Sequence, residues 1–425
     1  MLRLIYNIAL LAALLPILPW LLVKVVRVPG YAAWIRSRLA WQTKEPRVPG
    51  RKPCLWLHAL SVGETVSARP LLRALRHRYP QAILVLSSST RAGAALARET
   101  CAEFVDAHLI LPYDLPGAAT RLSRRVRPDL FILVETDFWP NLLQALAARQ
   151  VPLLLVNGRM SASSWRFYRW LRPLVLPLLF APFSFLAMQT RAEAARMVAL
   201  GVAEERVGVL GNLKYAAAAE AAAAGRGLER ADLGIGPEKL FWVAGSTHAG
   251  EEEIILRAWQ RLRPEFPALF LVLAPRRVER AAAVLALAAK GDGRAGLRSR
   301  GEIGLDLLIL DSYGELAALY PLCDLAFIGG SLVPAGGHNP LEAAACHKPV
   351  LFGPHMEDFA EISQDLLAAG GACRVHDEDE LVQGLRRWLA DPAARSECGR
   401  QAGELTIRRG RGVIAAHLAT VERLL

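Results

Sequence analysis

The chain has 425 residues, which is enough for two domains, and 53% of them are hydrophobic. Such a composition excludes an intrinsically disordered protein and supplies a large core. The formal net charge of +11 suits partners that carry phosphate groups or anionic lipids. The six cysteines include no CxxC pair, so their spacing argues against a zinc site or a disulfide framework and is typical of a reducing compartment.

The chain opens with an apolar stretch, residues 4–23, that carries no charged residue. Its 20 residues are just long enough to cross a membrane, and no cleavage site of the kind that ends a signal peptide follows it. We therefore predict a membrane anchor over residues 1–28, although Pro16 and Pro19 are also compatible with a bent or interfacial helix. Only Arg3 precedes the stretch, so the basic residues after it predict a cytoplasmic location for the rest of the chain. These basic residues are Arg36, Arg38, Lys44, Arg47, Arg51 and Lys52.

Beyond residue 47, short apolar runs alternate with helical stretches, which predicts parallel sheets covered by helices on both faces. The predicted strands of the first half are residues 54–60, 82–89, 130–135 and 152–157, and those of the second half are 241–246, 269–275, 307–311, 325–331 and 349–354. Predicted helices include residues 69–78 and 141–149. An Ala-rich stretch separates the halves, so we expect one domain at 29–215, a linker at 216–236 and a second domain at 237–425, with a ligand held between them.

Polar residues follow several of these strands, and ligands bind at such strand ends in doubly wound sheets. Glu64 follows the first predicted strand, and Glu135 closes the third. Both have a structural alternative. Glu64 is also favourable to the dipole of the helix that it opens, and Glu135 could be a partly buried carboxylate with a partner.

The segment 329–342, GGSLVPAGGHNPLE, combines two Gly-Gly pairs with an Asn-Pro that can open a helix at Asn339. Exposed backbone N–H groups in such a segment suit a phosphate. The segment is neither a Walker motif nor GxGxxG, so it predicts neither an ATPase nor a dehydrogenase. Because the basic residues are dispersed and no nucleic-acid-binding module is present, we do not expect nucleic acid as a partner.

Seven segments along the chain carry a family likeness: HALSVGE (58–64), LPYDLPG (111–117), ETDFWPN (135–141), GNLKY (211–215), AGSTHAGEE (244–252), APRRVER (274–280) and GGSLVPAGGHNPLE (329–342). They resemble the 3-deoxy-D-manno-octulosonic acid (Kdo) transferases of lipopolysaccharide synthesis. The resemblance implies an α/β fold of two facing Rossmann-like domains, the GT-B glycosyltransferase type, behind the membrane helix. It also implies transfer of Kdo from CMP-Kdo to the 6′-hydroxyl of lipid IVA, with inversion and without a metal or other cofactor, on the cytoplasmic face of the inner membrane.

The resemblance places the catalytic base at Glu64 and transition-state stabilisers at Glu135 and Lys214. A base here would take the proton of the attacking hydroxyl, while the stabilisers would offset charge on the sugar and on the departing CMP. Asp137 replaces the usual glutamate of its motif and is expected to be structural. The CMP contacts implied are Pro275, Arg276, Tyr313, Gly314, Glu315, Asn339, Pro340, Leu341 and Glu342, with Ser246, Thr247 and the turn 329–331 as further candidates.

Residues 165–185 contain three arginines, several aromatic residues and three prolines. They fit either an amphipathic core helix that ends at Pro173 or an interfacial patch for lipid phosphates and inner membrane lipids. Two other functions stay open at this point. One is a glycosyltransferase of the same fold that uses another nucleotide sugar, and the other is a membrane-tethered, non-catalytic protein that binds nucleotide sugars.

Overall fold

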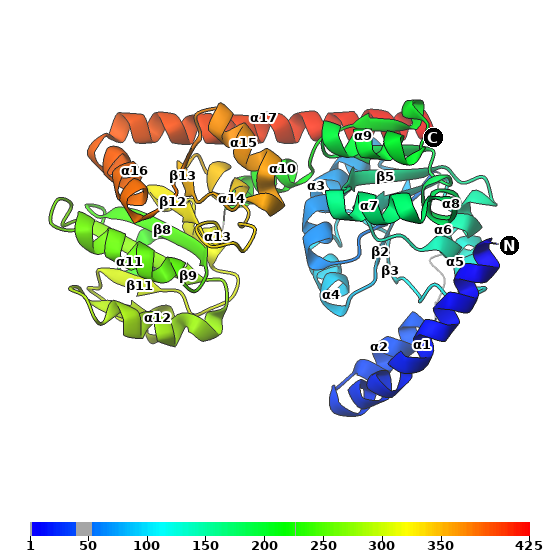
Figure 1. Cartoon of the computed structure of the whole chain (residues 1–425), viewed down its shortest axis with the longest axis horizontal. Helices are drawn as coiled ribbons and strands as arrows, with labels where there is room; N and C mark the ends of the chain where they lie inside the picture. The colour runs from blue at the N-terminus through cyan, green and yellow to red at the C-terminus, as the bar shows by residue number, and fades with distance from the viewer. Residues whose placement is uncertain (1, 40–52, 226) are drawn as a thin grey trace. The chain divides into compact units, whose positions relative to one another are not determined.

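The computed structural model describes residues 2–39, 53–225 and 227–425. These form two compact units, which are residues 1–213 with 411–425 (unit 1) and residues 214–410 (unit 2) (Figure 1). The predicted linker 216–236 thus contains most of a helix of unit 2, and the end of the chain is part of unit 1. Four of the basic residues that predict the orientation of the anchor lie outside the described residues: Lys44, Arg47, Arg51 and Lys52.

Two helices precede the first sheet, α1 (Leu2–Arg27) and α2 (Tyr31–Arg38). Helix α1 is the one helix of the described residues that is long and apolar enough to cross a membrane, with a mean hydropathy of 2.3 over its most apolar window. Gly30, in the left-handed conformation at φ 73°, forms the turn into α2.

Unit 1 is built on a parallel sheet of seven strands in the order β3-β2-β1-β4-β5-β6-β7. Its strands are β1 (Cys54–His58), β2 (Ile83–Ser88), β3 (Ala107–Ile110), β4 (Leu130–Val134), β5 (Leu153–Gly158), β6 (Phe185–Met188) and β7 (Val207–Val209). The central strands are buried on both faces because their residues are almost all apolar. The strand order reverses between β1 and β4, and loops diverge at such a point to leave room for a ligand.

Helices cover both faces of this sheet. They are α3 (Val62–Arg78), α4 (Arg91–Thr100), α5 (Ala118–Val126), α6 (Pro140–Ala147), α7 (Ala162–Trp170), α8 (Arg172–Val175), η1 (Leu176–Phe180), α9 (Arg191–Leu200) and η2 (Glu204–Arg206). Side chains of α3 and α4 and of residues 413–421 pack on one face, and those of α5, α6, η1 and α9 pack on the other.

Unit 2 repeats this plan with a parallel sheet in the order β10-β11-β9-β8-β12-β13-β14, which reverses between β8 and β12. Its strands are β8 (Leu240–Thr247), β9 (Leu269–Pro275), β10 (Ala295–Leu297), β11 (Leu307–Ile309), β12 (Leu325–Ile328), β13 (Val350–Phe352) and β14 (Ala372–Arg374). The two parallel seven-stranded sheets confirm the predicted fold class of two Rossmann-like domains.

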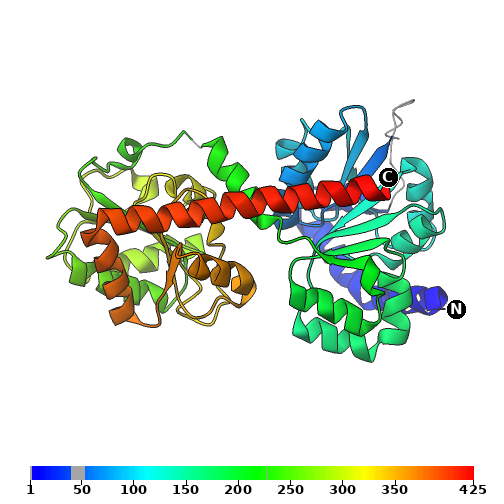
Figure 2. The ribbon, with the colours of Figure 1, turned by 90° about the horizontal axis from the view of Figure 1, so that it is seen from above.

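The helices of unit 2 again lie on both faces of the sheet. They are α10 (Lys214–Ala224), η3 (Arg230–Leu233), α11 (Glu251–Leu262), η4 (Val278–Arg280), α12 (Ala281–Ala288), η5 (Arg298–Arg300), α13 (Leu316–Leu319), α14 (Leu341–Ala344), η6 (Glu357–Phe359), α15 (Ala360–Ala368), α16 (Glu378–Ala390) and α17 (Pro392–Leu424). Helices α11, α12 and α16 cover one face, and α10, α14 and α15 cover the other. Helix α17 is continuous over its 33 residues (Figure 2), and its last part belongs to unit 1.

Candidate active site

Glu64 lies in the first turn of α3, directly after β1 and at the reversal point of the unit 1 sheet. Ser61 caps this helix and so fixes the direction in which the turn leaves the strand. The carboxylate is only 8% exposed, and its Oε2 accepts a hydrogen bond from the backbone N–H of Leu60 at 2.6 Å. Glu64 therefore satisfies both interpretations of its sequence position: it lies at the end of a strand, and it is favourably placed for the dipole of α3.

The surroundings of Glu64 raise the pKa of its carboxyl group to about 8. Burial is the main cause, and the negative charges of Glu135 and Asp137 add to it, while hydrogen bonds from Leu60 and Ser61 oppose it. A carboxyl group with such a pKa takes up and gives back a proton near neutral pH. This is the property that a general base needs.

Glu135 follows β4 and has a left-handed backbone conformation, with φ 61°. Its N–H donates to the carbonyl of Val156, and its Oε1 accepts a hydrogen bond from Asn157 Nδ2 at 3.1 Å. Asn157 is itself left-handed, and its Oδ1 accepts the N–H of Leu213 at 2.9 Å. Strained backbone of this kind is held in place by its neighbours and is common at functional sites. Glu135 is thus partly buried and paired, as its structural alternative expected.

Asp137, two residues after Glu135 in the loop between β4 and α6, is the centre of a hydrogen-bond network. Its Oδ2 lies 2.8 Å from His58 Nε2 and accepts a hydrogen bond from Trp139 Nε1 at 2.6 Å. The other ring nitrogen of His58 lies 2.8 Å from Ser87 Oγ, and the ring is fully buried. His58 is consequently a satisfied interior residue, and Asp137 has contacts that suit the structural part expected for it.

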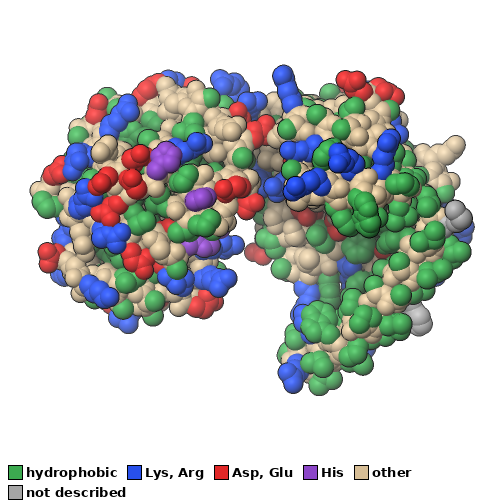
Figure 3. All heavy atoms as spheres, viewed as in Figure 1, with side chains coloured by type: hydrophobic (Ala, Val, Ile, Leu, Met, Phe, Trp, Pro, Cys, Tyr) green, Lys and Arg blue, Asp and Glu red, His purple; other side chains and the backbone are tan. Residues whose placement is uncertain are grey.

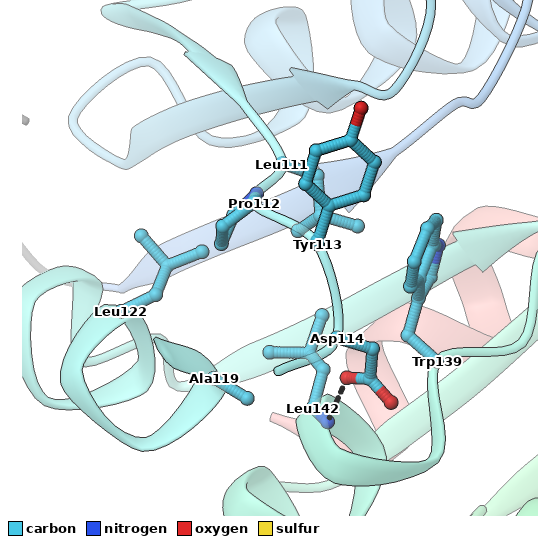
Figure 4. Close-up of a pocket in the computed structure, with 8 residues that line it drawn as sticks. All are labelled: Leu111, Pro112, Tyr113, Asp114, Ala119, Leu122, Trp139 and Leu142. Carbon is cyan, nitrogen blue, oxygen red and sulfur yellow. Dashed lines mark hydrogen bonds between the residues drawn. The ribbon is translucent and has the colours of Figure 1, made fainter. Parts of the chain in front are cut away.

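The segment LPYDLPG is joined to the start of α6 through Asp114, a residue that the sequence did not single out (Figure 4). Asp114 points at the start of α6, where it accepts the N–H groups of Asn141 at 2.8 Å and of Leu142 at 3.1 Å. Tyr113 and Trp139 line the same small pocket. The only sequence signal was an aspartate in a loop, a residue type that often caps a helix. The helix that Asp114 caps follows a different strand, however, so no local sequence pattern connects the two.

Lys214 is the first residue of α10 and belongs to unit 2. Its Nζ lies 4.6 Å from the centre of the Phe359 ring, at cation–π distance. The next residue, Tyr215, is buried and donates a hydrogen bond to Asp365 at 2.7 Å. These contacts anchor the start of α10.

In unit 2, three of the expected CMP contacts follow β9 and β11. Arg276 is exposed, and its N–H donates to the Thr247 carbonyl at 2.9 Å, which joins the ends of β8 and β9. Tyr313 is exposed and donates to Glu279 at 3.0 Å. Glu315 pairs with Arg298 at 3.1 Å. Arg298 also lines a pocket of about 230 Å³ near η3.

The residues Asn339 to Glu342 form the start of α14. Asn339 Oδ1 accepts the N–H of Leu341 at 3.2 Å, and Asn339 Nδ2 donates to Glu342 at 3.3 Å. Pro340 and Leu341 are buried and have apolar side chains. The polar groups of this segment therefore belong to Asn339, to Glu342 and to the backbone.

The turn 329–331 does not offer its backbone N–H groups to a phosphate, which corrects the expectation from the sequence. The buried side chain of Glu251 accepts them instead, from Gly330 at 2.7 Å, Ser331 at 2.9 Å and Leu332 at 2.8 Å. It also accepts the N–H of His248 at 2.9 Å. Glu251 therefore fills this anion site with the chain's own carboxylate. In the sequence, the signal that could have identified this role of Glu251 was its position at the start of α11.

Two histidines stand at the reversal point of the unit 2 sheet, one after β8 and one after β12. The Nε2 atoms of His248 and His338 are 2.9 Å apart, and the rings are stacked. Burial, His248 and Arg276 lower the pKa of His338 to about 4, against the opposing influence of Asp358. His338 is therefore neutral at pH 7, and a nearby anion would favour protonation of His338. Within the described ranges, no three His, Cys, Asp or Glu side chains are arranged as a metal site.

The segment 165–185 divides into an exposed and a buried part. Basic and hydrophobic side chains lie together around α7 on the surface of unit 1 (Figure 3), where Phe167 is 56% and Trp170 is 77% exposed. Phe180 and Phe183 are fully buried in the core. Trp165 and Tyr168 of α7 are partly buried against the core, as expected of an amphipathic helix, and α7 ends at Trp170, before Pro173. The interfacial role of its exposed side chains stays a prediction.

Comparison with known proteins identifies relatives along most of the chain. Residues 34–217 match the family "3-Deoxy-D-manno-octulosonic-acid transferase (kdotransferase)", and residues 304–404 match "Glycosyl transferases group 1". The chain is 33% identical to the 3-deoxy-D-manno-octulosonic acid transferase of Haemophilus influenzae, over 85% of this chain and 84% of the relative. The corresponding protein of Bordetella pertussis is 34% identical, over 92% of this chain and 93% of the relative.

Among solved structures, a UDP-GlcNAc 2-epimerase of Neisseria meningitidis bound to UDP-GlcNAc has a TM-score of 0.63. The alignment covers 87% of this chain and all of that one, at 12% identity. This likeness concerns the fold alone.

Proposed function

Because the chain belongs to the Kdo transferase family, as relatives at 33% and 34% identity over most of its length establish, we propose that it transfers Kdo from CMP-Kdo to lipid IVA. The acceptor group would be the 6′-hydroxyl of lipid IVA, and the anomeric carbon would be inverted. The observation that carries the proposal is Glu64, a buried carboxyl group with a pKa of about 8 at the reversal point of unit 1.

In this mechanism the acceptor oxygen attacks the anomeric carbon of Kdo while the bond from that carbon to the CMP phosphate breaks. Glu64 takes the hydroxyl proton, and CMP leaves with the bonding electrons. Inversion follows from this single displacement, since the acceptor approaches opposite to the leaving phosphate. The base is active only when it is ionised, so a pKa of about 8 keeps a fraction of it ready at neutral pH.

Glu135 and Lys214 are proposed to stabilise the transition state. A carboxylate at Glu135 would offset the positive charge that develops on the sugar ring, and its left-handed backbone and the bond from Asn157 fix its direction. The Lys214 ammonium group would offset the charge that collects on the departing phosphate. Both groups are partly buried, which strengthens such interactions.

The donor would bind to unit 2, through Pro275 and Arg276, through Tyr313, Gly314 and Glu315, and through the residues from Asn339 to Glu342. Arg276 is an exposed guanidinium group at the end of β9, where a phosphate can reach it. Asn339, the residue that follows His338 in the chain, and Glu342 offer amide and carboxylate groups. This arrangement supports binding of an anionic nucleotide at the reversal point of the sheet.

Attachment to the cytoplasmic face of the inner membrane is proposed from two surfaces of unit 1. Helix α1 exposes large apolar side chains along most of its length, and α7 exposes Phe167 and Trp170 beside Arg166 and Arg169 (Figure 3). Aromatic rings at headgroup depth and guanidinium groups near lipid phosphates are the usual features of an interfacial helix. A lipid acceptor would meet these two surfaces.

The test is mass spectrometry of lipid IVA after incubation with membranes that contain the full chain and freshly made CMP-Kdo. We expect a Kdo-sized mass increment, whose multiplicity counts the residues transferred, and a loss of about 10³-fold in rate for Glu64→Gln. Glu103→Gln, which changes an exposed carboxylate on the same unit, is the matched control and should retain full activity. An unchanged rate for Glu64→Gln would remove this residue from the role of base.

The donor is tested separately by competition. CMP should inhibit the transfer and UDP should not, because the proposal assigns the unit 2 site to cytidine nucleotides. Inhibition by UDP alone would favour a glycosyltransferase that uses another nucleotide sugar. Nucleotide binding without any transfer by the wild-type chain would favour the non-catalytic alternative.

A further inference from the structure

Helix α1 is bound to unit 1 at its beginning, although most of it is exposed. Arg3 Nε donates to Asn141 Oδ1 at 3.0 Å, and Asn141 Nδ2 donates to Asn7 Oδ1 at 2.7 Å. Tyr6 donates its hydroxyl hydrogen to Asp114 at 3.0 Å. The positions 3, 6 and 7 share one face of a helix, so α1 has a polar docking face in its first two turns.

The partners of this docking face belong to the interior of unit 1. Asn141 is fully buried, and Asp114 is 5% exposed because it also caps α6. A polar group at such a place needs a hydrogen-bond partner, and α1 supplies one to each residue. The first turns of α1 therefore complete the structure of unit 1 around the segment ETDFWPN.

The other end of this N-terminal region is bound to the same unit. Arg38, at the end of α2, is 3% exposed, and its Nη1 donates to the carbonyl of Ser89 at 2.7 Å. Its guanidinium group lies 4.4 Å from the centre of the Tyr113 ring, and its own carbonyl accepts the Tyr113 N–H at 2.9 Å. The beginning of α1 and the end of α2 thus both contact unit 1, close to Tyr113 and Asp114.

These contacts conflict with a crossing of the membrane by α1. A helix of 26 residues is about 39 Å long, and a crossing would place its two ends on opposite sides of a hydrocarbon layer about 30 Å thick. Arg3, Tyr6 and Asn7 would then lie a full membrane thickness away from Asn141 and Asp114. Both ends of the region can reach unit 1 only if they lie on the same side.

The exposed surface of α1 nevertheless suits lipid. Leu4, Ile8, Leu15 and Leu22 are each 59–68% exposed, and several other apolar side chains between them are 42–53% exposed. Basic residues stand at both ends of the apolar stretch, with Arg3 before it and Lys24, Arg27 and Arg36 after it. Charges at both ends and apolar side chains between them fit a helix whose ends lie at headgroup depth.

We propose that α1 and α2 form a monotopic membrane-docking hairpin, in which α1 lies along one leaflet and does not cross the bilayer. Arg3 and the two α/β units are then on the same side of the membrane. This inference rests on the membrane attachment proposed above and adds its topology. It also makes the first turns of α1 part of the support for the loop that carries Glu135.

The topology is tested with the full chain extended by an epitope and a protease site ahead of residue 1. In inverted inner-membrane vesicles, added protease should remove the epitope, and in spheroplasts it should not, because the hairpin keeps this end on the cytoplasmic side. Removal of the epitope in spheroplasts alone would show a crossing helix and overturn the inference while leaving membrane attachment intact. Recovery of the chain in the washed soluble fraction would overturn the attachment itself.

The docking contact is tested by cross-linking in membranes. With the partly buried Cys346 and Cys373 changed to Ser, the pair Asn7→Cys and Asn141→Cys should be joined by a short bis-maleimide. The pair Leu22→Cys and Asn141→Cys is the control, because Leu22 is 65% exposed and lies about four helical turns beyond Asn7 along α1. Equal yields for both pairs would contradict the docked arrangement, and a yield at least tenfold higher for the first pair would support it.

Discussion

The two units share one sheet plan, but the side chains at their reversal points differ in charge. In unit 1, carboxylates follow the strands that flank the reversal, Glu64 after β1 and Glu135 after β4. In unit 2 the corresponding strand ends carry His248 and His338, and Arg276 follows the neighbouring strand β9. Under the proposed function, the same backbone carries groups for proton transfer in one unit and groups for an anion in the other. The chemistry is decided by a few side chains at strand ends rather than by the fold.

Two glutamates show the same contrast at the level of single groups. Glu64 and Glu251 both lie in the first turn of the helix that follows the first strand of their sheet. Glu64 accepts one strong backbone hydrogen bond and lies near two other carboxylates, whereas Glu251 accepts four backbone N–H groups. A carboxylate with many donors holds a turn together, and one with few donors and like charges nearby is ready to accept a proton.

The largest effect on this contrast is expected from Glu251→Ala. The change leaves four backbone N–H groups of unit 2 without their acceptor, at a cost of about 3 kcal/mol or more. Hydrogen exchange followed by mass spectrometry should show roughly 100-fold faster exchange in β8 and β12, with β1 and β4 unchanged. Glu265→Ala, which removes an exposed partner of Arg386, should change exchange little. Unchanged protection of β12 in Glu251→Ala would refute this account of the turn.

A smaller effect is expected from His338→Gln on nucleotide binding. The pKa of His338 is about 4 in the free protein, and a bound phosphate raises it, so wild-type affinity for CMP should increase as the pH falls from 8 to 6. At pH 6 the variant should bind about tenfold more weakly, because it lacks the charge-assisted hydrogen bond. Both affinities are measured by calorimetry across this pH range. The titration of CMP itself affects both proteins equally, so it does not contribute to the difference between them. His376→Gln, at an exposed histidine of the same unit, should bind like the wild type.

The pH profile of unit 1 provides a third test. Because Glu64 must be ionised and its pKa is about 8, kcat/KM should fall about tenfold for each pH unit below 8. Asp137→Asn removes one of the negative charges that raise this pKa, so the acid limb should move to lower pH, with a roughly several-fold gain at pH 6.5 relative to the maximum. A limb that stays in place would mean that Asp137 does not act on Glu64 through its charge.

The smallest effect is expected from the surface of unit 1. Arg166→Ser on α7 should weaken binding to anionic vesicles about fivefold, equivalent to about 1 kcal/mol, and the loss should disappear at high salt. Arg400→Ser, on α17 within unit 2, is the control because its guanidinium group is already paired with Glu397 and Glu404. Equal losses for both variants would indicate a general charge effect rather than a membrane-facing helix.

The fold was predictable where a strand is continuously apolar and lies inside its sheet. The nine strands expected from sequence are all present, including the runs around 130–135 and 269–275, because such runs are buried on both faces. The strands that sequence missed are β3, β6, β7, β10 and β14, which have three or four residues each. Four of these five are edge strands, where burial is incomplete and the apolar signal is weak, and β6 lies next to an edge.

The candidate site was predictable only in part. The strand-end position of Glu64 follows from the alternation of strands and helices, and its protonation behaviour depends on neighbours such as Glu135 and Asp137 that are distant in sequence. The amide groups of the turn 329–331 illustrate the opposite case. The local sequence indicated an anion site there, but Glu251 is 79 residues from Gly330 and no local pattern links the two.

By itself, the sequence determined the two α/β halves, the apolar N-terminal helix and the family resemblance, because these depend on local periodicity and on contiguous motifs. The tertiary structure decided which polar groups are partners. It brought Glu251 to the turn after β12, Asp114 to the start of α6, and the first turns of α1 to Asn141. Hydrogen bonds between residues far apart in the chain leave no trace in local composition, since they form only when packing of the apolar core sets the distances.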